Sequence, residues 1–195
     1  MDYEKGATMK ELQDYSADFD LNLKLHDFSK DAIVELLMQT SKLYMQVCGF
    51  YDNELKKTVG FDEADRIGYD AWLRHIPYSV KWVAQAFNIQ GNDVDAVFRT
   101  LQFHPGWGLV YKCDYELKNK NHGIMTVIHC PTLEYFEKTG QFENWGKRIC
   151  EVWDPAQFQE FARLFNPDIK VRTLKLPPRK SKDEMPCIWE FKLES

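Results

Sequence analysis

The sequence predicts an α+β fold in which N-terminal helices pack on a four-stranded antiparallel sheet of ββαββ order. Three observations lead to this prediction. Apolar side chains recur at helical spacing in residues 29–105, and residues 106–195 contain four stretches with the two-residue alternation of strands. Helical stretches separate the second of these strands from the third. The two regions together are expected to form one domain, because 195 residues suffice for a single core.

The N-terminal residues 1–28 are expected to form an acidic arm, since residues 1–20 contain six acids and two lysines. The first helix is predicted to begin at Lys30 after the capping residue Ser29, and to end at Gly49. Pro77 is expected to break the chain between the second and third helices. The four expected helices cover residues 30–48, 63–74, 78–87 and 93–101.

The four predicted strands cover residues 109–115, 124–130, 169–176 and 187–193. In the last strand, Trp189 and Phe191 share the face of Cys187. Between the second and third strands we expect helical stretches at residues 132–139, 143–150 and 155–165. Asp154 followed by a proline has the pattern of a cap for the last of these.

The composition narrows the class of function. Hydrophobic residues make up 44% and charged residues 28%, which is typical of a globular protein. The formal charge of −5 argues against a nucleic-acid partner. No apolar run approaches the roughly 18 residues that a membrane span needs, and the N-terminus has no signal-peptide pattern, so we expect a cytoplasmic protein without a membrane partner. No nucleotide-binding, serine-hydrolase or zincin motif occurs.

Three of the five cysteines, Cys130, Cys150 and Cys187, each fall at the end of an expected element. Ends of elements can meet on one rim, and thiolates there can share a zinc ion or another divalent transition metal. These three cysteines are therefore the predicted metal ligands, with buried packing residues as the alternative. His129, Glu134 and Asp154 are candidates for a fourth ligand, although Asp154 suits the helix cap better.

Two further groups of residues are candidates for a site. The run His129-Cys130-Pro131 permits a haem-thiolate contact, so haem is a minor alternative cofactor. Aromatic residues and histidines in the helical region suggest a ligand pocket, with ordinary core packing as the alternative. The ligand-binding candidates are Trp72, His75, Trp82 and His104. The basic segment 170–182 is expected to be a solvated face, or else to attract an anionic partner.

Four short segments carry a resemblance that covers residues 60–193. They are Gly60–Ala64 with Tyr69–Trp72, the order Cys130, Gly140, Cys150, the turn Asn166–Ile169, and the strand Cys187–Phe191. In these the chain resembles a prokaryotic family of unknown function whose members are described as L-2-amino-thiazoline-4-carboxylic acid hydrolase-like, and more distantly the 4-vinyl-reductase type of small-ligand domain. The resemblance implies that the three cysteines belong together and that a metal-activated water opens a ring. Glu151 and the basic loop before Cys187 depart from the family pattern.

These observations lead to three hypotheses. The first is a metal-dependent hydrolase for a small polar substrate, thiazoline- or amide-like, in which Glu134 or His129 moves the proton. The second is a module that binds a small apolar or aromatic ligand among Trp72, Trp82 and Trp107, in which any cysteine-ligated zinc is structural. The third is a thiol or haem sensor at Cys130. The expected partner is a small molecule, and a homodimer is left open.

Overall fold

The computed structural model describes residues 11–194, so the first ten residues of the expected acidic arm lie outside the described part. Residues 11–28 run back to the start of the first helix. There the Ser29 amide donates to the Leu12 carbonyl at 2.8 Å, next to the short 3₁₀ turn η1 (Leu25–Asp27).

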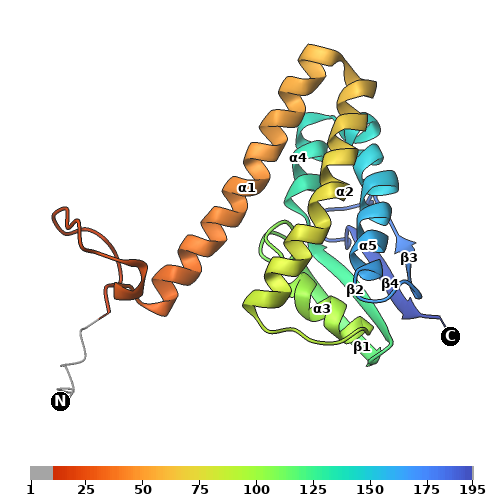
Figure 1. The fold of residues 1–195 in the computed structure, drawn as a ribbon. Helices are drawn as coiled ribbons and strands as arrows, with labels where there is room; N and C mark the ends of the chain where they lie inside the picture. The colour runs from red at the N-terminus through yellow and green to blue at the C-terminus, as the bar shows by residue number, and fades with distance from the viewer. Residues whose placement is uncertain (1–10, 195) are drawn as a thin grey trace.

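Two long antiparallel helices, α1 (Lys30–Val59) and α2 (Phe61–Ala86), form a hairpin (Figure 1). Ser29 caps α1 as predicted, accepting from the Ala32 amide. The predicted ends at Gly49 and Pro77 are wrong, because both residues lie inside continuous helices. A proline inside a helix costs one backbone hydrogen bond, and burial of Ile76 and Val80 beside it offsets this loss.

A single residue, Gly60, joins α1 to α2. Its φ of 82° lies in the region that favours glycine, and its amide still donates to the Lys56 carbonyl. In Figure 1 the second half of α1 lies beside α2, while its first half extends away from the rest of the protein. We call α2 and the elements that follow it the body of the protein. The C-terminal half of α1 therefore lies against this body.

The remaining elements follow the predicted order. Helix α3 (Val94–Gln102) begins after the capping residue Asp93, one position later than expected. The hairpin of β1 (Lys112–Asn119) and β2 (His122–His129) leads into α4 (Pro131–Thr139). Helix α5 (Asp154–Arg163) then precedes β3 (Ile169–Lys175) and β4 (Cys187–Leu193).

The connection between α4 and α5 differs from the predicted short α-helix. It contains two π-helical segments, η2 (Phe142–Gly146) and η3 (Ile149–Trp153), and η3 runs directly into α5. Trp153 therefore occupies the N-cap position, and the predicted capping role of Asp154 is wrong. Wide π turns are rare and often occur at functional sites.

The fold is α+β, as the sequence predicts. The four strands form one antiparallel sheet in the order β1-β2-β4-β3. Met125, Val127, Trp189 and Phe191 are buried on the face that the helices cover. The other face carries polar pairs, such as His122 with Glu190 at 2.9 Å. This alternation agrees with the predicted faces of the last strand.

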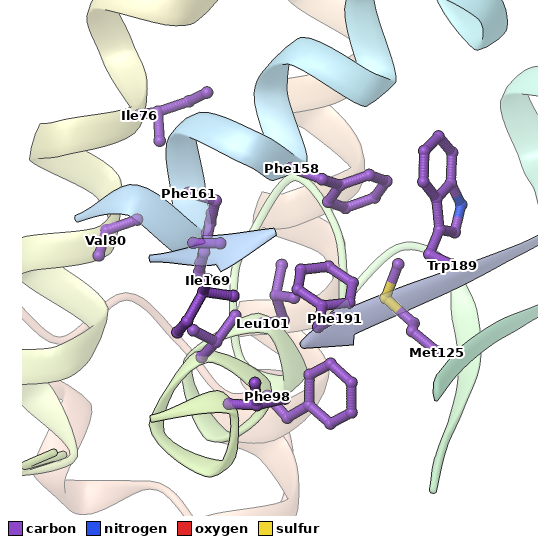
Figure 2. Packing of buried hydrophobic residues seen from close by; sticks show 13 residues of the cluster. Ile76, Val80, Phe98, Leu101, Met125, Phe158, Phe161, Ile169, Trp189 and Phe191 are labelled. Carbon is purple, nitrogen blue, oxygen red and sulfur yellow. The ribbon is translucent and has the colours of Figure 1, made fainter. Parts of the chain in front are cut away.

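The main core lies between this face of the sheet and helices α2, α3 and α5. Figure 2 shows Phe158 of α5 beside Trp189 and Phe191 of β4, with Ile76 and Val80 of α2 on the left, on the side of Phe161. A second, smaller cluster holds Phe136 of α4 together with the tryptophans of the π segments, Trp145 and Trp153. This cluster packs the π segments against α4.

No helix within residues 11–194 combines the length and the apolar character needed to cross a membrane.

Candidate functional site

A cavity of about 620 Å³ lies between the second half of α1 and the rest of the body. Most of its wall comes from five places along the chain. They are residues 42–53 of α1, the loop 106–111 before β1, the end of β2 with the start of α4, the π segments, and the start of β4. Trp72 of α2, the start of α5, and two prolines of the loop before β4 complete the lining. The volume lies within the range of about 300–1,000 Å³ that small-molecule sites occupy.

Aromatic side chains form much of the cavity wall. Trp72 comes from α2, Trp107 and Tyr111 from the loop before β1, and Trp145 and Trp153 from η2 and η3. Trp107 stacks on Tyr111, with ring centroids 4.9 Å apart. The Tyr111 hydroxyl forms a hydrogen bond of 2.6 Å with the Thr132 hydroxyl. The aromatic wall is thus held in place from two sides.

A buried carboxylate fixes η3 against α2. Asp65 accepts one hydrogen bond from the indole Nε1 of Trp153 and one from Nε of Arg148, both at 2.8 Å. Gly68 lies one turn further along α2, where a Cβ would come within 2.5 Å of the Trp153 ring. The close approach of α2 to η3 therefore depends on a glycine and on a charged hydrogen-bond acceptor.

The three predicted metal ligands, Cys130, Cys150 and Cys187, all line this one cavity. Two of the sulfurs have local hydrogen bonds. Cys130 caps α4 by accepting from the Leu133 amide at 3.2 Å, and Cys187 accepts from the Trp189 indole at 3.1 Å. Burial raises the pKa of Cys130 to about 12 and raises the pKa of Cys150 and Cys187 as well. All three are neutral thiols at pH 7.

Asp154, the first residue of α5, also lines the cavity. Burial raises the pKa of its carboxyl group to about 8. The Asp154 charge in turn helps to raise the pKa of Tyr111 and of the three thiols, so these groups surround it. The carboxyl group neither accepts a side-chain or backbone hydrogen bond nor forms an ion pair with any residue between 11 and 194.

The predicted proton-transfer residues lie at the edge of the cavity. His129 contributes to the lining, and its Nε2 is 3.3 Å from the Glu134 carboxylate. Both side chains are about half exposed, at 50% and 46%. Arg179 from the basic loop binds Glu137 through two hydrogen bonds of 2.9 and 2.7 Å. This arginine of the basic loop is thus already paired with a carboxylate.

The four predicted ligand-binding residues do not lie together in the structure. Trp72 lines the cavity, whereas His75, Trp82 and His104 do not. Trp82 is 60% exposed on α2. His104 is buried, and its Nδ1 accepts from the Gly106 amide at 3.1 Å. Burial, and then the nearby His75, lower the pKa of His104 to about 3, so the ring is neutral.

The predicted metal-binding function is wrong for the part of the chain that the structure describes. No group of three or more His, Cys, Asp or Glu side chains there could hold a metal ion. The local hydrogen bonds of Cys130 and Cys187 give a physical reason, because each sulfur is directed to a neighbouring N–H group. The metal-dependent hydrolase and the structural zinc are therefore both withdrawn.

Comparison with protein families matches residues 26–193 to one family model of unknown function. The chain belongs to DUF6125, a family of unknown function. The DUF6125 match covers every strand and all helices from α1 to α5. The chain matches no curated protein and no solved structure. The comparisons thus support an uncharacterised family, and they support neither the hydrolase-like description nor the likeness to 4-vinyl reductases.

Several cavity residues of this DUF6125 protein were not among the predicted site residues. They include Tyr111, Trp145 and Trp153. Tryptophans at these positions have the same sequence signal as core residues, because the π segments that direct them to the cavity follow no 3.6-residue pattern. Asp154 is a candidate metal ligand in the sequence, but the proline that follows it favours a capping role.

Proposed function

We propose that this protein binds a small aromatic or heteroaromatic molecule in the cavity between α1 and the body. The observation that carries the proposal is the cavity of about 620 Å³ whose wall combines four indole rings with a few buried polar groups. Ligand sites typically have this composition, with an apolar surface and a small number of polar groups that orient the ligand.

Two further features support binding at this place. The cavity borders both π-helical segments, and such segments are maintained at functional sites more often than elsewhere. The buried thiols and the Asp154 carboxyl group are neutral or close to neutrality at pH 7, so an uncharged ring system meets little desolvation cost.

The test is calorimetric titration of the full chain with 2-(1-naphthyl)ethanol, a neutral aromatic probe. We expect a Kd below about 1 mM. Gly49 lines the cavity, and a Cβ there would meet no atom within 4 Å, so side chains can be added at this position. Gly49→Phe should weaken probe binding by at least about tenfold by filling the space, while Gly49→Ala serves as the matched control and should leave the affinity unchanged.

Two results would refute the proposal. One is the absence of binding at 1 mM by this probe and by its charged analogues. The other is equal binding by wild type and a folded Gly49→Phe variant, which would place the probe elsewhere.

A further inference from the structure

Asp154 is a cavity residue whose carboxyl group has no role that a hydrogen bond or an ion pair within residues 11–194 explains. It does not cap α5, because the N-cap position belongs to Trp153. Its carboxyl group has no hydrogen-bond or ion-pair partner among residues 11–194, although it faces a cavity lined by Tyr111 and three thiols. Asp154 is partly buried, and a carboxyl group without a partner at the wall of a largely apolar cavity is suited to face a ligand.

The charges of the cavity wall favour a positive ligand. Asp52 of α1 is a second carboxyl group in the lining, and Lys42 is the only lysine or arginine there within the described residues. Lys42 lies on α1 as an exposed residue, so the Asp154 carboxyl group has no permanent cation beside it. An anionic ligand would find no positive charge beside Asp154, and its own negative charge would oppose ionisation of that carboxyl group.

The aromatic wall is also suited to a positively charged ligand. The ammonium group of Lys56, which is not part of the cavity lining, lies 3.8 Å from the ring centroid of Trp145, a residue that does line the cavity. This contact is an example within the protein of an indole face that holds an ammonium group. Trp72 and Trp107 bring further indole rings to the cavity lining, where a ligand can use them.

We propose that the ligand of this cavity is an organic cation, an aromatic or alkyl amine whose ammonium group pairs with the Asp154 carboxylate while its carbon skeleton packs on the indole rings. The inference rests on the proposed small-molecule function and adds the class of ligand. The ammonium group supplies the hydrogen-bond donors that Asp154 lacks, and the ion pair is shielded from solvent.

The test compares three probes of the same ring and different charge by calorimetry at pH 7. They are 2-(1-naphthyl)ethylamine, 2-(1-naphthyl)ethanol and 1-naphthylacetate. We expect the amine to bind at least about tenfold more tightly than the alcohol, and the acetate more weakly than either. Asp154→Asn should reduce the preference for the amine to within about threefold and leave the affinity for the alcohol unchanged.

Asp52→Asn is the matched control, because it neutralises the other carboxyl group of the same lining. It should keep the preference for the amine. Loss of the preference in Asp52→Asn and not in Asp154→Asn would overturn the assignment to Asp154. Equal binding of amine and alcohol by wild type would overturn the inference and leave the proposed function intact, whereas failure of all three probes would refute the proposed function itself.

A second measurement does not depend on the variant. When the ammonium group arrives, the Asp154 carboxyl group loses its proton to the buffer, so titrations in two buffers of different ionisation enthalpy should report proton release for the amine and none for the alcohol. The other titratable groups of the cavity lining within the described residues are Lys42, Cys48, Asp52, Tyr111, His129, Cys130, Tyr135, Cys150 and Cys187. Amine binding without proton release would contradict pairing with Asp154.

Discussion

Asp65 links α2 to the η3 region through one hydrogen bond to each of two residues. It accepts from Trp153 and Arg148 while almost fully buried, with 7% of its surface exposed. Asp65→Ala leaves a buried indole N–H without an acceptor and a guanidinium group without its carboxylate. We expect the free energy of unfolding to fall by about 2–3 kcal/mol, measured by urea denaturation.

The control for Asp65 is Glu143→Ala. Glu143 pairs with Lys147 at 3.1 Å on the surface, with 74% of its side chain exposed. Exposed ion pairs contribute little, so this change should alter the stability by less than about 0.5 kcal/mol. Similar losses of unfolding free energy from both substitutions would mean that the burial of Asp65 does not determine its contribution to stability.

Single residues also show how far the sequence could predict the site. Cys130, Cys150 and Cys187 all line one cavity, but within residues 11–194 they do not form the metal-binding cluster that the ends of the elements suggested. The sequence could not reveal that the Cys130 sulfur caps α4 or that Cys187 accepts from Trp189, because both depend on side-chain orientation. These contacts give the sulfurs local roles in the fold.

Helix α1 offers a comparison of two glycines within one element. Gly49 has helical surroundings with open space at its Cβ position, while Gly60 ends the helix with a φ of 82°. Gly49→Ala should raise the free energy of unfolding by about 0.5–1 kcal/mol, because alanine favours a helix. Gly60→Ala should lower it by about 1–2 kcal/mol, because a Cβ disfavours this φ.

Chemical denaturation of the two variants checks this prediction. If both substitutions change the stability in the same direction, the conformation of one of the two glycines differs from the structure described above.

The elements that were predicted well are those with a strong local pattern. Strand β4 coincides with the predicted residues 187–193, because alternation and a preceding proline define it. Gly49 and Pro77 misled the prediction for α1 and α2, because burial of an apolar face outweighs a helix-disfavouring residue. The π segments could not be predicted, since they depend on the tertiary contacts of Trp145 and Trp153.

The stability of the whole molecule should depend on pH through two buried groups that act in opposite directions. Burial raises the pKa of Asp154 from its ordinary 3.8 to about 8, so the folded state binds more protons than the unfolded state between these values. Stability from this group is therefore present below about pH 4 and is lost as the pH rises to about 8. Asp154→Asn should remove this loss.

The measurement for Asp154 is the difference in unfolding free energy between Asp154→Asn and wild type. This difference should grow by more than about 1 kcal/mol in favour of the variant between about pH 5 and about pH 8. A constant difference over this range would contradict a carboxyl group that is buried without a partner.

His104 has the opposite effect. Its pKa falls from the ordinary 6.5 to about 3, so its contribution is present above about pH 6.5 and is lost as the pH decreases toward 3. His104→Gln should cost stability at pH 7 and cost less at about pH 4. Comparison of each variant with wild type separates the two effects, which partly cancel in the wild-type curve.

The position of α1 has a consequence for motion. Thirty residues of helix span about 45 Å, and one glycine connects this length to the body. The half near Gly60 is a wall of the cavity, while the far end carries residues 11–28. A rotation of about 10° at Gly60 would move that far end by about 8 Å. A bound molecule that widens or narrows the cavity by a small distance would thus cause a larger displacement at the far end of α1.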